Sequence, residues 1–337
     1  CPPREVSCLS WERISIDGAP IDPERFIAAY DDVIPYVEMV DGHTLAAGGA
    51  PMNYFQTLVA VAYAAFADAP VDVAVIEVGL GGRWDATNVA DGAVAVVGPV
   101  SLDHTRLLGD SVEEIAGEKA GIIKADARVV SAVQEPDVAT ILLDAASEVG
   151  ASVAFDGVDF GVTEREVAIG GQLLTVTGLA ATYPELFLPL HGPHQAHNAA
   201  LAVAAVESFV GGGEQLLDIE VLRAGLAAAT SPGRLEIVRR SPTVIVDAAH
   251  NPHGAQALAE ALKDSFAFGR LVGVLAVFAD KDATGILETL EPVLDEVVVT
   301  RNTSPRAMDP GELGALAAEI FGEHRVTVVR DLPDALD

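Results

Sequence analysis

Residues 71–88 read VDVAVIEVGLGGRWDATN and join a run of β-branched residues to a glycine-rich loop. The run from Val71 to Val78 predicts a central strand that is buried on both faces. Glu77 lies near the C-terminal end of this run, and the glycines after it let the backbone approach a ligand. Open α/β sheets bind ligands at that end of their strands, where a carboxylate suits Mg²⁺. The alternative is a glycine-rich turn in which Glu77 faces solvent.

Strands and helices alternate on both sides of this stretch. Two helices are expected before it, at residues 27–40 and 54–66. After it we expect strands at 93–100 and 129–133, helices at 112–120 and 140–149, a β-rich segment at 153–190, and helices at 198–210 and 221–229. This order is typical of an α/β domain.

The run TSPG at residues 230–233 interrupts the pattern, and a second α/β unit follows it. We expect strands at 243–247, 271–277 and 296–300, and helices at 254–263 and 283–290. The sequence therefore predicts two domains, residues 1–231 and 232–337.

Composition excludes several classes of protein. The 337 residues include 20 Lys and Arg against 50 Asp and Glu, a net charge of −30, so a protein that coats nucleic acid is excluded. Two cysteines, Cys1 and Cys8, are consistent with a reducing cytosol. The apolar runs are far shorter than the ~20 residues of a membrane span. We expect a cytoplasmic protein that binds neither nucleic acid nor membrane.

Two further polar groups follow the second predicted strand. His104, in Leu102-Asp103-His104, comes just past the strand end, so Glu77 and His104 could converge on one metal or phosphate site. The alternative for a lone histidine is a structural, hydrogen-bonded residue. Lys119 is notable because the chain has only four lysines, although an ordinary surface lysine is a fair alternative.

Two polar stretches lie near the predicted domain junction. HGPHQAHN at residues 191–198 has three histidines without a cysteine or carboxylate nearby, so ligand contact by Asn198 at a helix N-terminus is favoured over zinc. Arg234 offers a planar fork for phosphate, and Asp247 and His250 lie at the edge of the second sheet. The alternative is a turn made of turn-forming residues.

Eight stretches together carry a resemblance that none of them carries alone. They are ERISIDG (12–18), Phe55 with its helix, EVGLGGRWDATN (77–88), SLDHTRLLG (101–109), GEKAGII (117–123), HQAHNAALA (194–202), SPGRLE (231–236) and DAAHNPHGA (247–255). In these stretches and their order the chain resembles the dihydrofolate synthase/folylpolyglutamate synthase family of the Mur ligase superfamily. The resemblance implies a P-loop-type ATPase domain over residues 1–231, then a Rossmann-like Mur ligase C-terminal domain over 232–337, both incomplete at their outer ends.

The resemblance also implies an activity and its site. Family members are usually monomeric, and they are ATP-dependent ligases in which ATP phosphorylates a pteroate or folate carboxylate and the amine of L-glutamate attacks the resulting acyl phosphate. By motif, Glu77 and His104 would hold Mg²⁺, and Lys119 would be the lysine that members carbamylate. The residues Phe55, Trp84, Asp85 and Ala86 would line the pterin site, Asn198, Arg234 and Asp247 would contact ATP, and Lys119 and His250 would act in catalysis.

The chain departs from the family pattern in three places. The phosphate-binding motif GxxGKGS does not occur in it, residues 1–11 diverge, and Gln56 stands where many members have Glu. We expect a chain truncated at both ends, with this polypeptide inactive as a ligase and its full-length parent active. Two alternatives are another Mur-type amino-acid ligase and a non-catalytic folate-binding paralogue.

Overall fold

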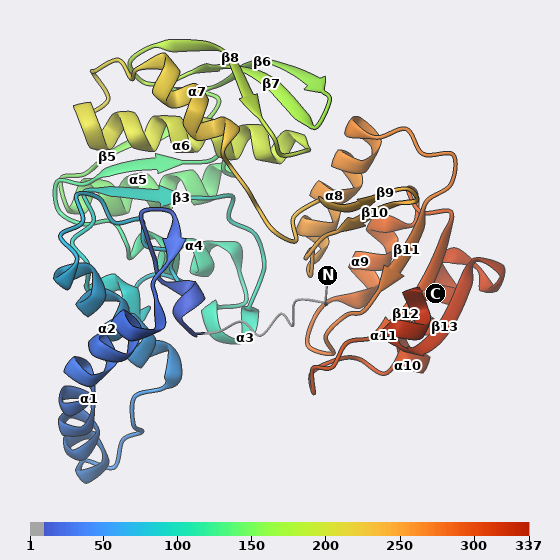
Figure 1. Ribbon diagram of the computed structural model, residues 1–337, viewed down its shortest axis with the longest axis horizontal. Coiled ribbons are helices and arrows are strands. Elements are labelled where there is room, and N and C mark those ends of the chain that lie inside the picture. The colour runs from blue at the N-terminus through green and yellow to red at the C-terminus, as the bar shows by residue number, and fades with distance from the viewer. Residues whose placement is uncertain (1–9, 337) are drawn as a thin grey trace. The chain divides into compact units, whose positions relative to one another are not determined.

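The computed structural model describes residues 10–336 (Figure 1). Contacts divide the chain into two compact units, residues 1–91 and 92–337, which are described separately. The domain boundary that the sequence predicts near residue 232 falls inside the second unit and stays a prediction.

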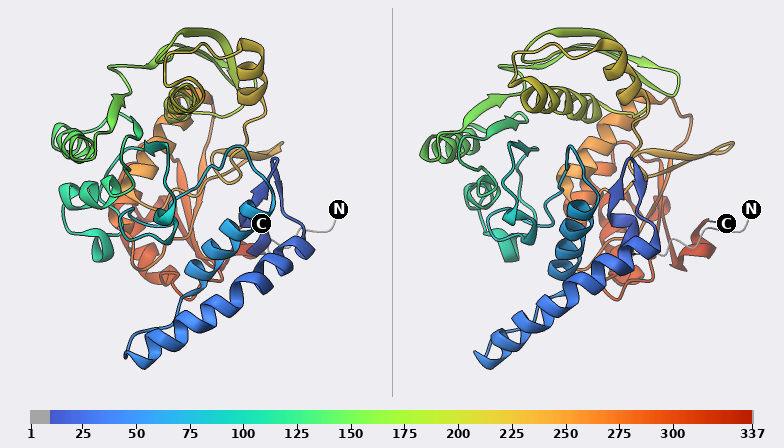
Figure 2. Two further views of the ribbon diagram at one scale, coloured as in Figure 1. Left: turned by 90° about the vertical axis from the view of Figure 1, so that its left-hand side faces the viewer. Right: turned by 60° about the vertical axis from the view of Figure 1, so that its left-hand side comes forward.

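The first unit is built on two helices. Its elements are η1 (Ser10–Arg13), β1 (Ser15–Ile16), β2 (Ala19–Pro20), α1 (Pro23–Ala46), α2 (Tyr54–Asp68) and η2 (Ala86–Val89). Both helices were predicted, but α1 extends beyond the predicted range of 27–40 at both ends, and Pro35 lies inside it. Ile14, Leu58 and Val61 are buried between these elements, and Figure 2 shows α1 lying against α2.

The predicted strand at 71–78 is wrong. The segment has no strand among the described residues, and the side chain of Val75 is 93% exposed. A β-branched run favours a strand only where a neighbouring backbone supplies its hydrogen bonds, and no described segment pairs with this one.

The second unit begins with a parallel sheet in the order β3-β4-β5. Its strands are β3 (Val94–Val97), β4 (Arg128–Ser131) and β5 (Ser152–Phe155), accompanied by α3 (Thr105–Leu108), α4 (Val112–Ala120) and α5 (Pro136–Glu148). Ile115, Val129 and Leu142 are buried together between α4, β4 and α5. The alternating strands and helices confirm the prediction for this part, and α4 has the predicted bounds.

An antiparallel sheet and two helices follow. The strands are β6 (Gly161–Ala168), β7 (Gly171–Thr177) and β8 (Thr182–Leu188), and the helices are α6 (Pro193–Gly211) and α7 (Ile219–Ala227). The β-rich segment is confirmed, but α6 begins five residues before the predicted start. Pro193 fits the first helical position after Gly192, whose φ is 94°. Asn198 therefore lies in the second turn of α6, not at its N-terminus.

The last part of the second unit contains two more sheets. An antiparallel pair is formed by β9 (Glu236–Arg240) and β10 (Thr243–Val246), and a parallel sheet by β11 (Val272–Leu275), β12 (Glu296–Arg301) and β13 (Val326–Asp331). The helical elements are α8 (Pro252–Ser265), α9 (Ala283–Leu290), α10 (Pro310–Phe321), η3 (Glu323–Arg325) and α11 (Leu332–Leu336). Leu287, Val299 and Leu313 form the centre of their core. The sequence predicts the five elements from β10 to β12, but not β9, α10 or β13.

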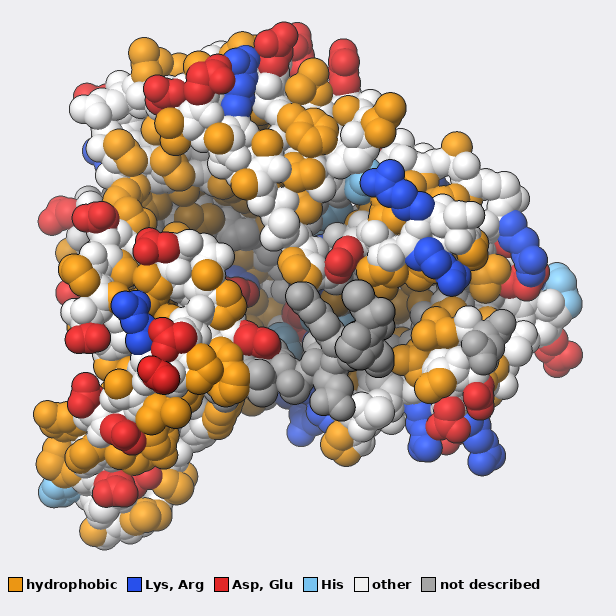
Figure 3. Space-filling view, viewed as in Figure 1, with side chains coloured by type: hydrophobic (Ala, Val, Ile, Leu, Met, Phe, Trp, Pro, Cys, Tyr) orange, Lys and Arg blue, Asp and Glu red, His pale blue; other side chains and the backbone are white. Residues whose placement is uncertain are grey.

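The surface agrees with the acidic composition. Red Asp and Glu side chains are scattered over the face in Figure 3. Of the helices in residues 10–336, none is long and apolar enough to cross a membrane.

Candidate active site

The glycine loop of the first unit is fixed by Asp85. This residue caps η2, and its Oδ1 accepts hydrogen bonds from the amide and the hydroxyl of Thr87, at 2.9 and 2.6 Å. Its Oδ2 accepts one from the amide of Leu80 at 2.9 Å. Partial burial works against ionisation of Asp85, but the hydrogen bonds from Thr87 and Leu80 lower its pKa below the ordinary value. Asp85 is therefore an ionised anchor for this loop.

The structure brings Phe55 and Asp85 to the same glycine. A Cβ placed on Gly79 would lie 2.4 Å from Cζ of Phe55 and 3.0 Å from Oδ2 of Asp85, so any larger residue would have to displace the ring of Phe55 or the loop. The side chain of Trp84 is 84% exposed, and Ala86 is the first residue of η2. Glu77, two residues before Gly79, is also exposed.

The principal polar cluster of the second unit surrounds Asp103, in the loop after β3. Its Oδ1 accepts from Nζ of Lys281 at 2.7 Å and from the amide of His104 at 2.8 Å. Its Oδ2 accepts from Nδ2 of Asn251 at 2.9 Å. Burial opposes ionisation, but these hydrogen bonds lower the pKa of Asp103 to about 2. Asp103 is therefore a carboxylate at neutral pH.

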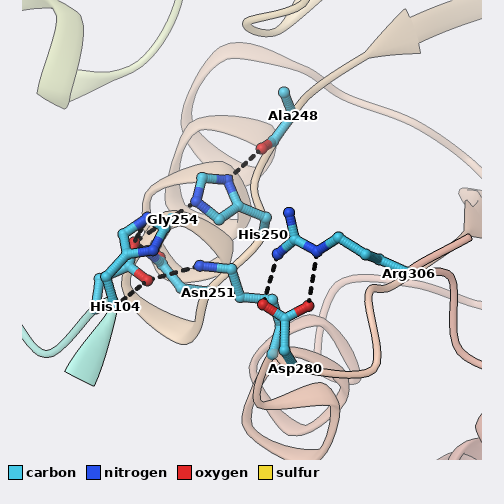
Figure 4. Close-up of polar contacts among 9 residues, drawn as sticks. His104, Ala248, His250, Asn251, Gly254, Asp280 and Arg306 are labelled. Carbon is cyan, nitrogen blue, oxygen red and sulfur yellow. Dashed lines mark hydrogen bonds and ion pairs between the residues drawn. The ribbon is translucent and has the colours of Figure 1, made fainter. Parts of the chain in front are cut away.

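Two histidines flank this carboxylate. Nε2 of His104 lies 3.8 Å and Nε2 of His250 lies 3.6 Å from Oδ2 of Asp103. His104 precedes α3 in a left-handed conformation, with φ 51°. Nδ1 of His250 lies 3.0 Å from the carbonyl oxygen of Ala248, which only accepts, so Nδ1 carries the proton. Figure 4 shows His104, His250 and Asn251 gathered at this point.

Arg234 lies in a tight turn that Asp247 holds in place. The two carboxylate oxygens of Asp247 accept from the amides of Leu235 and Ala249, each at 2.8 Å. Gly233 and Leu235, on either side of Arg234, have φ values of 72° and 47°. The exposed guanidinium is thus presented on a constrained backbone.

The histidines of α6 and its approach differ in their surroundings. Burial lowers the pKa of both His191 and His194, and the Nδ1 atom of each is buried without a hydrogen-bond partner among the described residues. Nδ1 of His197 lies 2.7 Å from Oδ2 of Asp156, which raises the pKa of His197. Nδ2 of Asn198 donates to Oε1 of Gln195 at 3.2 Å.

The site residues predicted from the sequence are only partly brought together. Asp103 gathers His104 and His250, and one turn joins Arg234 to Asp247. Lys119 lies half-buried in the last turn of α4, apart from these hydrogen bonds. Glu77 belongs to the first unit and His104 to the second, so their approach stays a prediction. Within residues 10–336 no three His, Cys, Asp or Glu side chains form a group suited to a metal ion.

Sequence reasoning missed three residues of the cluster: Asp103, Asn251 and Lys281. The scarcity of lysine, which singled out Lys119, applied equally to Lys281 and would have found it. Asp103 stood next to a chosen histidine, but its partners are 148 and 178 residues away in the chain.

Known proteins resemble this chain in sequence and in structure. Residues 233–337 match the family described as "Mur ligase, glutamate ligase domain". The dihydrofolate synthase/folylpolyglutamate synthase of Mycobacterium tuberculosis is 53% identical over 97% of this chain and 69% of its own length. The protein of the same name from Bacillus subtilis is 34% identical, over 88% and 68%.

Solved structures agree with these matches. Mycobacterium tuberculosis folylpolyglutamate synthase complexed with ADP has a TM-score of 0.92 at 53% identity, covering 97% of this chain and 72% of that one. A folylpolyglutamate synthase complex with AMPPCP and folate has a TM-score of 0.82 at 31% identity, covering 96% and 78%. The chain therefore belongs to the dihydrofolate synthase/folylpolyglutamate synthase family, whose members are ATP-dependent glutamate ligases.

Proposed function

We propose that this chain serves the ligation of L-glutamate to dihydropteroate, to a folate, or to both. The observation that carries the proposal is the 53% identity with the Mycobacterium tuberculosis protein over 97% of the chain. The complexes of similar structures with ADP, and with AMPPCP and folate, support the same ligands here.

The reaction has two bond-making steps. A carboxylate oxygen of the pteroate or folate attacks the γ-phosphorus of ATP, and ADP leaves with the bridging oxygen. The amine of glutamate then attacks the carbonyl carbon of the acyl phosphate, the new C–N bond forms, and inorganic phosphate leaves as the amine loses a proton. The protein must therefore bind three anionic substrates and limit the access of water to the acyl phosphate.

Arg234, Asp247 and Asn198 are the side chains that we assign to ATP. Arg234 presents a fork suited to phosphate oxygens, on a turn that Asp247 braces. We assign a catalytic role to His250, close to the reacting groups. An Arg234→Gln variant should weaken ADP binding in calorimetry, whereas Arg239→Gln, on the exposed strand β9, should leave it unchanged.

We assign Mg²⁺ to Glu77 and His104. Glu77 supplies the kind of ligand that Mg²⁺ takes in proteins, a carboxylate that acts together with water and substrate phosphates. Imidazole is a less usual ligand for Mg²⁺, so the place of His104 in the donor set rests on the family motif. The carboxylate of Asp103 next to His104 also resembles the partner that orients a metal-binding histidine. The bound ion would offset charge that develops on the phosphates.

Lys119 is assigned as a carbamylated lysine, which mass spectrometry under bicarbonate should detect as added CO₂.

The pterin ring is assigned to Phe55, Trp84, Asp85 and Ala86. The exposed indole of Trp84 offers an aromatic face, and Asp85 offers an ionised acceptor. The chain has two tryptophans, Trp11 and Trp84, which makes fluorescence a direct test. Dihydropteroate should quench the emission of a Trp11→Phe variant, in which Trp84 remains, and should not quench that of Trp84→Phe.

The same titration separates the alternatives. A UDP-muramyl peptide that binds in place of dihydropteroate and tetrahydrofolate would contradict the folate assignment. Folate binding that persists in a parent protein containing the GxxGKGS motif, but without ADP release, would support a non-catalytic paralogue. The inactivity expected for the 337-residue polypeptide stays a prediction, tested by ADP release with both folate substrates and glutamate.

We also propose a cytoplasmic monomer. Light scattering coupled to size exclusion would measure the mass of the particle, to be compared with 34.9 kDa for one chain.

A further inference from the structure

Asp103 connects segments that are far apart in the sequence. Asn251 caps α8, and Lys281 lies in the loop between β11 and α9. That loop is braced independently, because Arg306 forms an ion pair with Asp280 at 2.6 Å, also seen in Figure 4. The carboxylate of Asp103 therefore bonds to two residues, Asn251 and Lys281, whose segments are also held by other contacts.

The contacts of this carboxylate leave it little freedom. Each oxygen accepts at least one hydrogen bond, from Lys281 and the His104 amide at one and from Asn251 at the other. The side chain of Lys281 is only 9% exposed, so its ammonium depends on Asp103 for a counter-charge. The imidazoles of His104 and His250 meet at the oxygen that Asn251 orients.

We propose that Asp103 is a positioning residue for the ligase reaction, which fixes the rings of His104 and His250 relative to each other through its bonds to Lys281 and Asn251. The proposal rests on the proposed function, because that function supplies the roles of the two histidines. Removing a partner that orients a reacting or metal-binding side chain typically lowers activity or metal affinity by about 10-fold to 100-fold.

A second ion pair in the same unit provides the matched control. Arg165 of β6 makes a two-pronged contact with Asp264 of α8, including an Nη1–Oδ1 distance of 3.0 Å. It also joins segments that are distant in the sequence, and it touches neither His104 nor His250. If Asp103 had only a structural role, Asp103→Asn and Asp264→Asn would have the same effect on the rings of His104 and His250.

The experiment records ring ¹⁵N spectra of the labelled 337-residue chain at one fixed pH. The chain has eight histidines, and His104→Gln and His250→Gln assign the two signals of interest. In Asp103→Asn the new amide group meets the donors of Lys281 or Asn251, so both ring signals should shift or broaden. Lys281→Met should produce the same change, and Asp264→Asn should leave both signals in place.

Binding of Mg²⁺-ADP supplies the second readout. We expect Asp103→Asn and Lys281→Met to lose affinity by about 10-fold to 100-fold, with no comparable loss in Asp264→Asn. Unmoved ring signals in Asp103→Asn, or equal movement in Asp264→Asn, would overturn the proposal. If Asp103→Asn does not fold, Lys281→Met decides by the same criteria. The ring spectra need no ligand, so they decide the proposal even if the unaltered chain, which lacks the GxxGKGS motif, does not bind ADP. A full-length parent that contains this motif and does not release ADP with folate substrates and glutamate would contradict the proposed function alone.

Discussion

Gly79 illustrates how one residue shapes the glycine loop. Its Cα faces the ring of Phe55 and the carboxylate of Asp85, and an added Cβ would come within 2.4 Å of the ring. Gly79→Ala must displace Phe55 or the loop, which we expect to destabilise the first unit by about 1–3 kcal/mol. Urea unfolding followed by tryptophan fluorescence measures this, since Trp11 and Trp84 both belong to residues 1–91.

Gly225 is the matched control. It lies inside α7, where an added Cβ meets nothing within 4 Å. Gly225→Ala should leave the tryptophan transition unchanged and stabilise its helix by about 0.5–1 kcal/mol. A Gly79→Ala transition that matches the parent chain would show that Phe55 moves aside without cost.

The pair of His197 and Asp156 should make stability depend on pH. The hydrogen bond that His197 donates to the carboxylate of Asp156, whose side chain is 2% exposed, raises the pKa of His197 above its ordinary value of 6.5. The folded state then holds a proton that the unfolded state releases first. The stabilisation is fully present below pH 6.5 and is lost as the pH rises through the higher folded pKa.

Chemical unfolding from about pH 6 to about pH 9 measures this dependence. We expect the parent chain to lose more unfolding free energy over that range than His197→Gln does. His253→Gln, which removes an exposed histidine of α8, should follow the parent. Identical pH profiles for the parent and His197→Gln would contradict the role of the pair.

Gln56 shows how the structure explains a departure from the family. Its Oε1 accepts from the amide of Asn53 at 2.9 Å, while Asn53 Oδ1 accepts from the amide of Gln56 at 3.0 Å. This reciprocal cap at the start of α2 works with either Gln or Glu at the third helical position. The substitution from Glu therefore preserves the helix start.

Elements whose partners are near in sequence were predicted better than those with distant partners. Helices α4 and α9 have the expected bounds, because their apolar spacing and capping residues Ser111 and Asp282 are local signals. The run at 71–78 has the composition of a strand, yet pairing decides whether a strand forms. Strand β9 was missed because its residues, EIVRR, carry charges that hide the pattern.

The buried Glu207 links α6 to the β7–β8 turn. Its carboxylate accepts from the amides of Leu179 and Ala180, at 2.5 and 3.2 Å, and from the hydroxyl of Tyr183 at 2.7 Å. Tyr183 in turn accepts from the amide of Leu217 at 3.0 Å. Glu207→Gln replaces an acceptor with a donor, and we expect it to lower the free energy of unfolding by about 1.5–3 kcal/mol. Thermal unfolding by circular dichroism measures it.

Tyr183→Phe tests whether these contacts act as one network. It removes one donor to Glu207 and one acceptor for Leu217, for an expected loss of about 1–3 kcal/mol. The double variant should lose less than the sum of the single losses, because both changes remove the same bond. The control is Glu220→Gln, which removes an exposed ion pair with Arg223 and should lower the free energy of unfolding by less than about 1 kcal/mol. Additive losses would contradict a shared network.

Across the whole molecule, the sequence located the site motifs but not their grouping. Arg234 and Asp247 were chosen from one local stretch, and the structure joins them through the amide of Leu235. The cluster at Asp103 depends on Lys281, 178 residues away, and no local pattern announces such a pairing. Motif spacing predicts what a segment offers, whereas the fold decides which segments meet.

The net charge of −30 predicts how the chain responds to salt. Salt weakens both the repulsion among excess carboxylates and the attraction within ion pairs. Exposed pairs such as Arg270–Glu296 and Arg223–Glu220 contribute only about 0–1 kcal/mol each. The repulsion acts over the whole surface, and the screening length falls from ~30 Å at 0.01 M to ~10 Å at 0.1 M.

Repulsion should therefore dominate, so raising NaCl from about 10 mM to about 300 mM should raise Tm by at least about 2 °C. Scanning calorimetry measures the rise, and tetramethylammonium chloride at equal ionic strength should match it if screening is the cause. A Tm that falls with salt would show that the ion pairs outweigh the repulsion.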